Sequence, residues 1–174
     1  MNNPEILGSK VSGEKRIEML ERNWLSHNAL WQMSAALIFG WDAGNQLNQK
    51  VTRDMGKIMM HRLMNSLGNS RVKNIKELRD ILVAIISLNW SDAMNKNRME
   101  TKSENLIYFE MNNCVTYDNI SKVNATDKYE CECFALRSGF CDALKLEVSQ
   151  ECKKYLMKGN EKCEIVLSVK NWQK

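Results

Sequence analysis

The sequence lacks the features that place a protein in a membrane, in a secretion pathway or on a nucleic acid. It contains no run of about 18 apolar residues, the length that a membrane-spanning helix needs. Residues 1–8 lack the basic flank and apolar stretch of a secretion signal. The 25 basic and 21 acidic residues are interspersed, without a basic stripe. We therefore expect a cytoplasmic protein with no membrane partner and no nucleic-acid partner.

Internal repeats, low-complexity segments and paired Cys-x-x-Cys motifs are also missing. A chain of 174 residues can bury a core without the help of disulfides. In a reducing cytosol, thiols stay free unless they are catalytic or bind metal. The six cysteines therefore favour metal binding, or burial as small apolar residues, over a disulfide framework.

The first ninety residues are predicted to be helical. Residues 1–12 show no periodic pattern and are expected to form a flexible tail, after which Ser12 can cap a helix that stops at Gly40. A second helix is predicted from about Asp42 to the region before Gly68. The residues expected on the buried faces are Ile17, Leu20, Trp24, Trp31, Ala35 and Ile38, then Leu47, Val51, Met55, Ile58 and Met59.

A third helix is predicted to begin at Asn74, with Glu77 completing a capping box. The polar run 91–104 is expected to contain a helix end and a loop. From Leu106 the apolar residues alternate as in a half-buried strand, and 116–127 is expected to be a loop or an irregular strand.

The remaining residues are predicted to form a strand, a short helix and a hairpin. Tyr129, Cys131 and Cys133 alternate with glutamates, which predicts a strand that carries both thiols on one face. Gly139 is expected to open the short helix, and a turn at 158–160 to join the two strands of a closing hairpin. The sequence thus predicts one α+β domain over residues 13–174. Its halves are helical (13–98) and sheet-rich (105–170), with a mostly antiparallel sheet.

Cysteines that are distant in sequence are brought together by this predicted sheet. Cys152 and Cys163 lie on the two strands of the hairpin, where cross-strand neighbours are about 4.5–5.5 Å apart. Cys133 can add a third thiolate. A closed structural zinc site needs a fourth ligand, which Cys114, Cys131 or Glu151 could supply. Buried thiols that bind nothing are the competing interpretation.

The order of these residues resembles the 4-vinyl-reductase-type small-molecule-binding domain, which is also the sensor of bacterial phenol-responsive regulators. The resemblance rests on Cys133, Gly139-Phe140, Cys152, a turn at Gly159, and Cys163. In such sensors the matching cysteines and one acidic residue hold zinc beside a buried ligand pocket. Here Ser149 stands at the acidic position. The resemblance implies a ligand-binding fold that vesicle-tethering proteins share.

From about Trp24 onward the chain also resembles a bacterial group related to the 2-amino-thiazoline-4-carboxylate hydrolases. The shared features are the opening at 26–31, the break at 39–41, a long second helix, and Cys114, Cys133, Cys152 and Cys163. This resemblance implies, as an alternative activity, hydrolysis of a small carboxylated heterocycle.

Three functions therefore remain open. The first, which we favour, is a small-molecule-binding or sensory domain with a structural zinc site, and the second is a small-molecule hydrolase. The third, implied by the resemblance, is a partner-binding module like the vesicle-tethering proteins of this fold, whose hydrophobic channel holds an acyl chain. A hydrolase would require His27 and a pocket carboxylate or thiol. An apolar pocket is expected to use Trp24, Trp31, Met55 and Met59, because methionine fills irregular space. An apolar helical face left uncovered would make the protein a homodimer.

Overall fold

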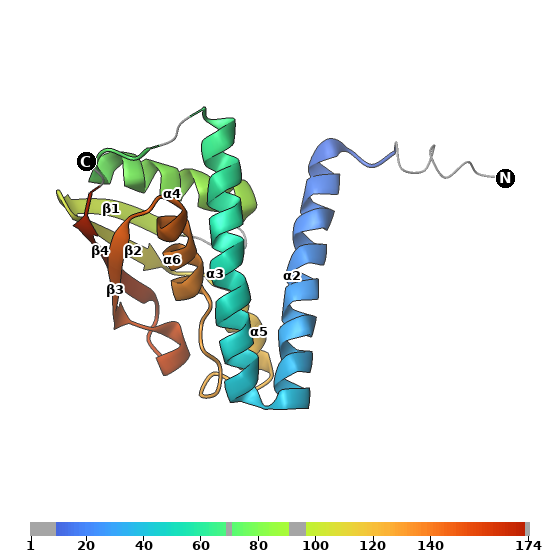
Figure 1. Ribbon diagram of the computed structural model, residues 1–174. Helices are drawn as coiled ribbons and strands as arrows, with labels where there is room; N and C mark the ends of the chain where they lie inside the picture. Colours follow the sequence, from blue (N-terminus) through green and yellow to red (C-terminus); the bar gives the residue numbers. More distant parts are fainter. Residues whose placement is uncertain (1–9, 69–70, 91–96, 173–174) are drawn as a thin grey trace.

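The fold is α+β, with long helices packed on an antiparallel sheet (Figure 1). The computed structural model describes residues 10–68, 71–90 and 97–172. The helices and strands in this part are α2 (Gly13–Phe39), α3 (Trp41–Ser66), α4 (Ile75–Asn89), β1 (Asn97–Ser103), β2 (Leu106–Met111), α5 (Val115–Lys122), α6 (Cys133–Ala143), β3 (Glu147–Lys154), the short 3-10 helix η1 (Leu156–Lys158) and β4 (Cys163–Asn171). None of the helices in these ranges is long and apolar enough to cross a membrane.

The ends of the three long helices follow the predicted signals. The Ser12 side chain accepts a hydrogen bond from the Lys15 backbone N–H at 3.2 Å, which starts α2. Gly40, at φ +88°, is the single residue between α2 and α3. Asn74 caps α4 as predicted. The Glu77 carboxylate, however, accepts from the Lys73 backbone N–H at 2.9 Å, one residue before the position that a capping box uses.

The sheet has the strand order β1-β2-β4-β3, and every neighbouring pair is antiparallel. The central pair aligns Ile107 with Leu167 and Phe109 with Ile165, and these four side chains are buried. The predicted alternation in β2 and β4 is therefore confirmed. Helices α4 and α6 pack on the sheet and α3 packs on α6, and Phe140 of α6 lies fully buried in the core.

Three segments differ from the prediction. Part of the run predicted as a loop, 97–103, forms edge strand β1, and residues 91–96 of that run lie outside the described part. An edge strand needs no apolar alternation, so its polar sequence gave no strand signal. The predicted loop 116–127 contains α5. The predicted strand at 129–133 is a wrong interpretation, because Cys133 begins helix α6, in which Gly139 is an interior residue.

The predicted buried faces of α2 and α3 are largely wrong. Ile17, Leu20 and Ile38 are 60–71% exposed, whereas Ala35 is buried as predicted, together with Gln32 and Ala36. In α3 the exposed apolar residues are Leu47, Val51 and Ile58, whereas the face toward the body carries Gly44, Asn45, Asn48, Gly56, Met59, Met60, Leu63 and Met64. Small side chains occupy the places where another helix comes close to α3. Polar side chains occupy the places where buried backbone N–H and C=O groups beside α3 need hydrogen-bond partners.

The closest helix contact joins α3 to α6 through Gly56 and Gly139. A Cβ atom on Gly139 would lie 2.1 Å from the Arg53 carbonyl oxygen, and one on Gly56 would lie 2.5 Å from the Leu136 carbonyl oxygen. Figure 1 shows α6 alongside the middle of α3. Because both clashes are with backbone, no side-chain rotation can relieve them.

We predict that Gly139→Ala lowers the free energy of unfolding by about 2–3 kcal/mol, as overpacking of a tight contact does. Chemical denaturation monitored by circular dichroism measures this loss. The control is Gly13→Ala in the first turn of α2, where nothing lies within 4 Å of the added Cβ. Equal stability of the Gly139→Ala variant and the wild type would contradict the described contact.

The exposed stripe of α2 supports the expectation of a homodimer, which stays a prediction. Ile17, Trp24, Trp31 and Ile38 recur every seven residues along the helix, the spacing at which helices pair. A two-fold axis lets such a stripe cover its own copy. We expect light scattering to give a dimer mass that Ile38→Glu reduces to the monomer and that Val83→Glu on α4 does not. A monomeric wild type would contradict this.

Candidate functional site

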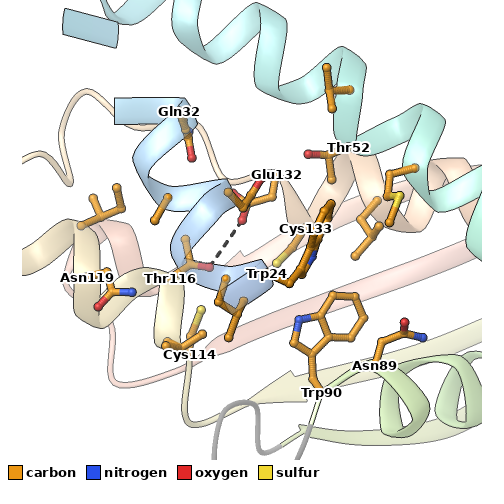
Figure 2. Close-up of a pocket in the computed structure, with 18 of the residues that line it drawn as sticks. Trp24, Gln32, Thr52, Asn89, Trp90, Cys114, Thr116, Asn119, Glu132 and Cys133 are labelled. Carbon is orange, nitrogen blue, oxygen red and sulfur yellow. Dashed lines mark hydrogen bonds between the residues drawn. The ribbon is translucent and has the colours of Figure 1, made fainter. Parts of the chain in front are cut away.

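A cavity of about 380 Å³ lies between α2, α3, α5, α6 and β2, with the end of α4 closing one side (Figure 2). Its wall is mostly apolar and includes Met55 and Met59 of α3, Phe109 of β2 and Phe140 of α6. Of the predicted pocket residues, Trp24, Met55 and Met59 line it, whereas Trp31 is not among the described lining residues. This volume is within the range of small-molecule sites.

Polar groups gather on the part of the wall formed by α5 and the start of α6. Figure 2 shows Glu132 and Thr116 facing each other, with the thiols of Cys114 and Cys133 nearby. The Thr116 hydroxyl donates to Glu132 Oε1 at 3.4 Å, while Glu132 Oε2 has no partner. Burial raises the pKa of Glu132, because its charged form would lose its hydration.

Further unpartnered polar atoms belong to the same wall. Gln32 Nε2 and Arg137 Nη2 are buried without a hydrogen-bond partner, and both residues are 4% exposed. Such atoms are rare in native proteins, and each calls for a physical explanation. With Glu132 Oε2, they give the cavity two donors and one acceptor that the chain leaves unused.

Arg137 lies in the wall between this cavity and a second, much smaller one of about 10 Å³. Its guanidinium carbon is 5.0 Å from the ring centres of both Phe109 and Phe134. Its Nε donates to Gln150 Oε1 at 2.7 Å. Within the described residues no carboxylate forms an ion pair with it.

The small cavity collects four thiols, those of Cys114, Cys131, Cys133 and Cys163. The adjacent Cys133 thiol is the main cause that lowers the pKa of Cys131 to about 7, and Arg137 adds to the effect. Burial raises the pKa of Cys114 to about 12. Cys114, Cys133 and Cys163, which are predicted zinc ligands, thus share one cavity with Cys131, which is predicted as an alternative fourth ligand.

Cys152 and Glu151 lie apart from this group. Cys152 is exposed on β3, where it pairs with Ile165 rather than with Cys163, and its sulfur contacts the Lys154 carbonyl oxygen at 3.1 Å. Glu151 is exposed and pairs with Lys153. Among the residues that the structure describes, no three His, Cys, Asp or Glu side chains are placed to hold one ion. These positions do not form the expected zinc shell, and zinc stays a prediction.

His27 lies on α2, stacked on Trp24 with ring centres 6.2 Å apart. It is not among the described residues that line the cavity. The sequence did not single out Glu132 or Arg137. Glu132 stands at a polar position of the predicted strand alternation, and a lone arginine in a short helix carries no signal of burial.

The sequence model of a family described as "Family of unknown function (DUF6125)" matches residues 9–154. The chain belongs to this family. None of the curated protein sequences matches this DUF6125 chain. The resemblances drawn from the cysteine order are therefore neither supported nor contradicted.

Solved structures give the DUF6125 chain a fold relative. A trafficking protein particle complex subunit 3 from Naegleria fowleri, covalently bound to palmitic acid, matches with a TM-score of 0.63 and 15% identity over 92% of this chain and 99% of that one. The likeness shows a shared fold. An H-NOX protein from S. oneidensis has a TM-score of 0.45 and 12% identity over 75% of this chain and 71% of that one, too low to define a common fold.

The exposure of the cysteines predicts their order of chemical modification. We expect Cys152 to react with Ellman's reagent in the folded protein, ahead of the buried Cys131 and Cys163, because only accessible thiols are attacked. Cys152→Ser should remove the fast phase, and Cys141→Ser should leave it unchanged. A fast phase that releases zinc would instead support the expected metal shell.

The raised pKa of Glu132 predicts a pH-dependent stability. A carboxyl whose pKa is higher in the folded than in the unfolded chain stabilises the fold at low pH, and this contribution is lost as pH rises through the folded value. The neutral Glu132→Gln variant escapes this loss. We expect its Tm to gain on the wild type as pH rises from about 5 to about 8. The exposed Glu161→Gln serves as control, and a constant Tm difference for Glu132→Gln would contradict the burial.

Proposed function

We propose that this protein is a small-molecule-binding or sensory domain whose ligand occupies the cavity between α2, α3, α5, α6 and β2. The observation that carries the proposal is the cavity itself, with its apolar wall and its unused donors and acceptor. An apolar cavity with a few convergent polar groups is the common form of a small-molecule site. A ligand would remove apolar surface from water and satisfy the unpartnered atoms.

The fold relative adds support. The Naegleria fowleri subunit is covalently bound to palmitic acid, so a protein of this fold binds an acyl chain. In the present chain we assign no covalent bond, because the thiols of Cys114 and Cys133 in the cavity wall have raised pKa values and are poor nucleophiles.

The position of α2 connects the ligand with a sensory role. Trp24 and Gln32 of α2 form part of the cavity wall, while Ile17 and Ile38 of the same helix are exposed. Figure 1 shows α2 bordered by α3 and joined to it by one short turn. A ligand that contacts α2 would therefore change how the helix packs, and with it the surface offered to a partner.

For the hydrolase alternative, the described cavity wall provides a carboxylate, Glu132, and the thiols of Cys114 and Cys133, but no histidine. His27, the residue that it requires, stacks on Trp24 and is not part of the described cavity wall. The structural zinc likewise remains a prediction from the cysteine order and is not needed for ligand binding in this cavity.

Binding of an uncharged apolar probe tests the proposal. We expect 1-decanol to shift the fluorescence emission of Trp24 and Trp90, which line the cavity, to shorter wavelength as it displaces water, and to raise the Tm with increasing concentration. Met55→Trp fills the cavity and should abolish both effects. Ile58→Trp, on the exposed side of the same helix, should retain them. No response in the wild type, or equal responses in the two variants, would contradict the proposal.

A further inference from the structure

We propose that the ligand is a carboxylic acid with an apolar body, and that Arg137 binds its carboxylate. This inference rests on the proposed ligand-binding function and specifies the chemical class of the ligand. It follows from the burial of Arg137, from the absence of a described acidic partner, and from the place of this residue in the cavity wall.

Arg137 carries a positive charge that no described acidic side chain balances. Its side chain is 4% exposed, and no described aspartate or glutamate forms an ion pair with it. Arginine keeps its proton in proteins, so it cannot become neutral when it is buried. A buried charge without a partner is strongly unfavourable, and native proteins pair such charges. An anion is therefore the missing component of this site.

The guanidinium group of Arg137 is held in place by its neighbours, and its Nη2 can still bind an anion. Phe109 and Phe134 both lie 5.0 Å from the guanidinium carbon, and Gln150 accepts the Nε hydrogen at 2.7 Å. Gln150 is held in turn by hydrogen bonds to the Phe134 carbonyl and the Ser138 hydroxyl, both at 2.9 Å. The guanidinium is thus fixed, with Nη2 unused. A planar carboxylate fits such a fixed planar donor better than a spherical anion does.

A cysteine thiolate is an anion that the chain itself could supply to Arg137. Cys131 is the candidate to consider, because its thiol lines the same small cavity as Arg137. Among the hydrogen bonds of the described residues, none joins the Cys131 sulfur to Arg137. A thiolate there leaves Nη2 without a partner.

The cavity wall beside Arg137 is apolar, which indicates the chemistry of the rest of the ligand. Around Arg137 the cavity wall is formed by Phe109, Met111, Leu136 and Phe140, which suits a hydrocarbon chain or ring. The only carboxyl group in the described wall is Glu132, which accepts a hydrogen bond from Thr116 and leaves Arg137 to a carboxylate from outside the chain. An apolar monocarboxylate satisfies both conditions.

A matched pair of probes tests this inference on the wild-type protein. Decanoate and 1-decanol have the same chain length and differ in the head group, and their affinities can be measured by tryptophan fluorescence and by calorimetry. We expect decanoate to bind at least about tenfold more tightly, because a hydrogen bond to a charged group outweighs one to a hydroxyl.

Substitution of Arg137 assigns the preference to this residue. Arg137→Met should remove the preference for decanoate while 1-decanol still binds, and Arg137→Lys should keep part of it. Arg98→Met on β1 removes an exposed cation outside the described wall, and should leave both affinities unchanged. If Arg137→Met does not fold, the wild-type comparison alone decides.

The outcomes separate this inference from the proposed function. If both probes bind equally well to the wild type, or if Arg137→Met keeps the preference for decanoate, the carboxylate inference is overturned and the ligand-binding function stands. If neither probe binds, both are overturned.

Discussion

The close contact between α3 and α6 is the constraint on which the rest of the structure depends. Because Gly56 and Gly139 lack side chains, the two helix backbones approach at distances that a Cβ atom would forbid. The contact fixes the position of α6 along α3 and the rotation of α6 about its own axis. These in turn decide which residues of α6 reach the sheet and which reach the cavity, so the candidate site depends on two residues that have no functional groups.

Polar residues of α3 extend this contact to the segment that leads into α6. Asn45 donates to the Lys128 carbonyl at 2.7 Å and accepts from the Glu130 backbone N–H at 3.2 Å. Gln49 donates to the carbonyls of Glu130 and Cys131, each at 3.1 Å. The buried side of α3 therefore serves as a template for irregular backbone, and it fixes where Glu132 enters the cavity wall.

Local signals in the sequence were sufficient for the ends of the long helices and for the central strands. Ser12, Gly40 and Asn74 act on neighbouring backbone groups, and the alternation in β2 and β4 reflects burial on one side of a sheet. The faces of α2 and α3 could not be predicted in this way. The face of α3 depends on partners more than 80 residues away, as in the contact between Arg53 and Asp142, and the apolar stripe of α2 does not reveal whether it faces its own chain.

The cysteine pattern shows the same limit for the candidate site. The alternation around Cys131 and Cys133 suggested a strand, yet the two thiols lie at the entrance of a helix, beside Cys114 and Cys163. The order of helices and strands in the sequence was enough to predict that these thiols lie close together. The exposure of Cys152, in contrast, depends on the register of β3 against β4, where Cys152 pairs with Ile165. The role proposed for Arg137 depends on its burial and on its lack of a described counter-ion, and the sequence indicates neither.

The account is tested most directly by a crystal structure of the protein with decanoate. We expect the hydrocarbon chain in the cavity beside Trp24 and Met55, with a carboxylate oxygen about 3 Å from Arg137 Nη2. Decanoate bound only outside the cavity, at the exposed Ile17 or Ile38 of α2, or a cavity filled by the chain's own side chains, would contradict it.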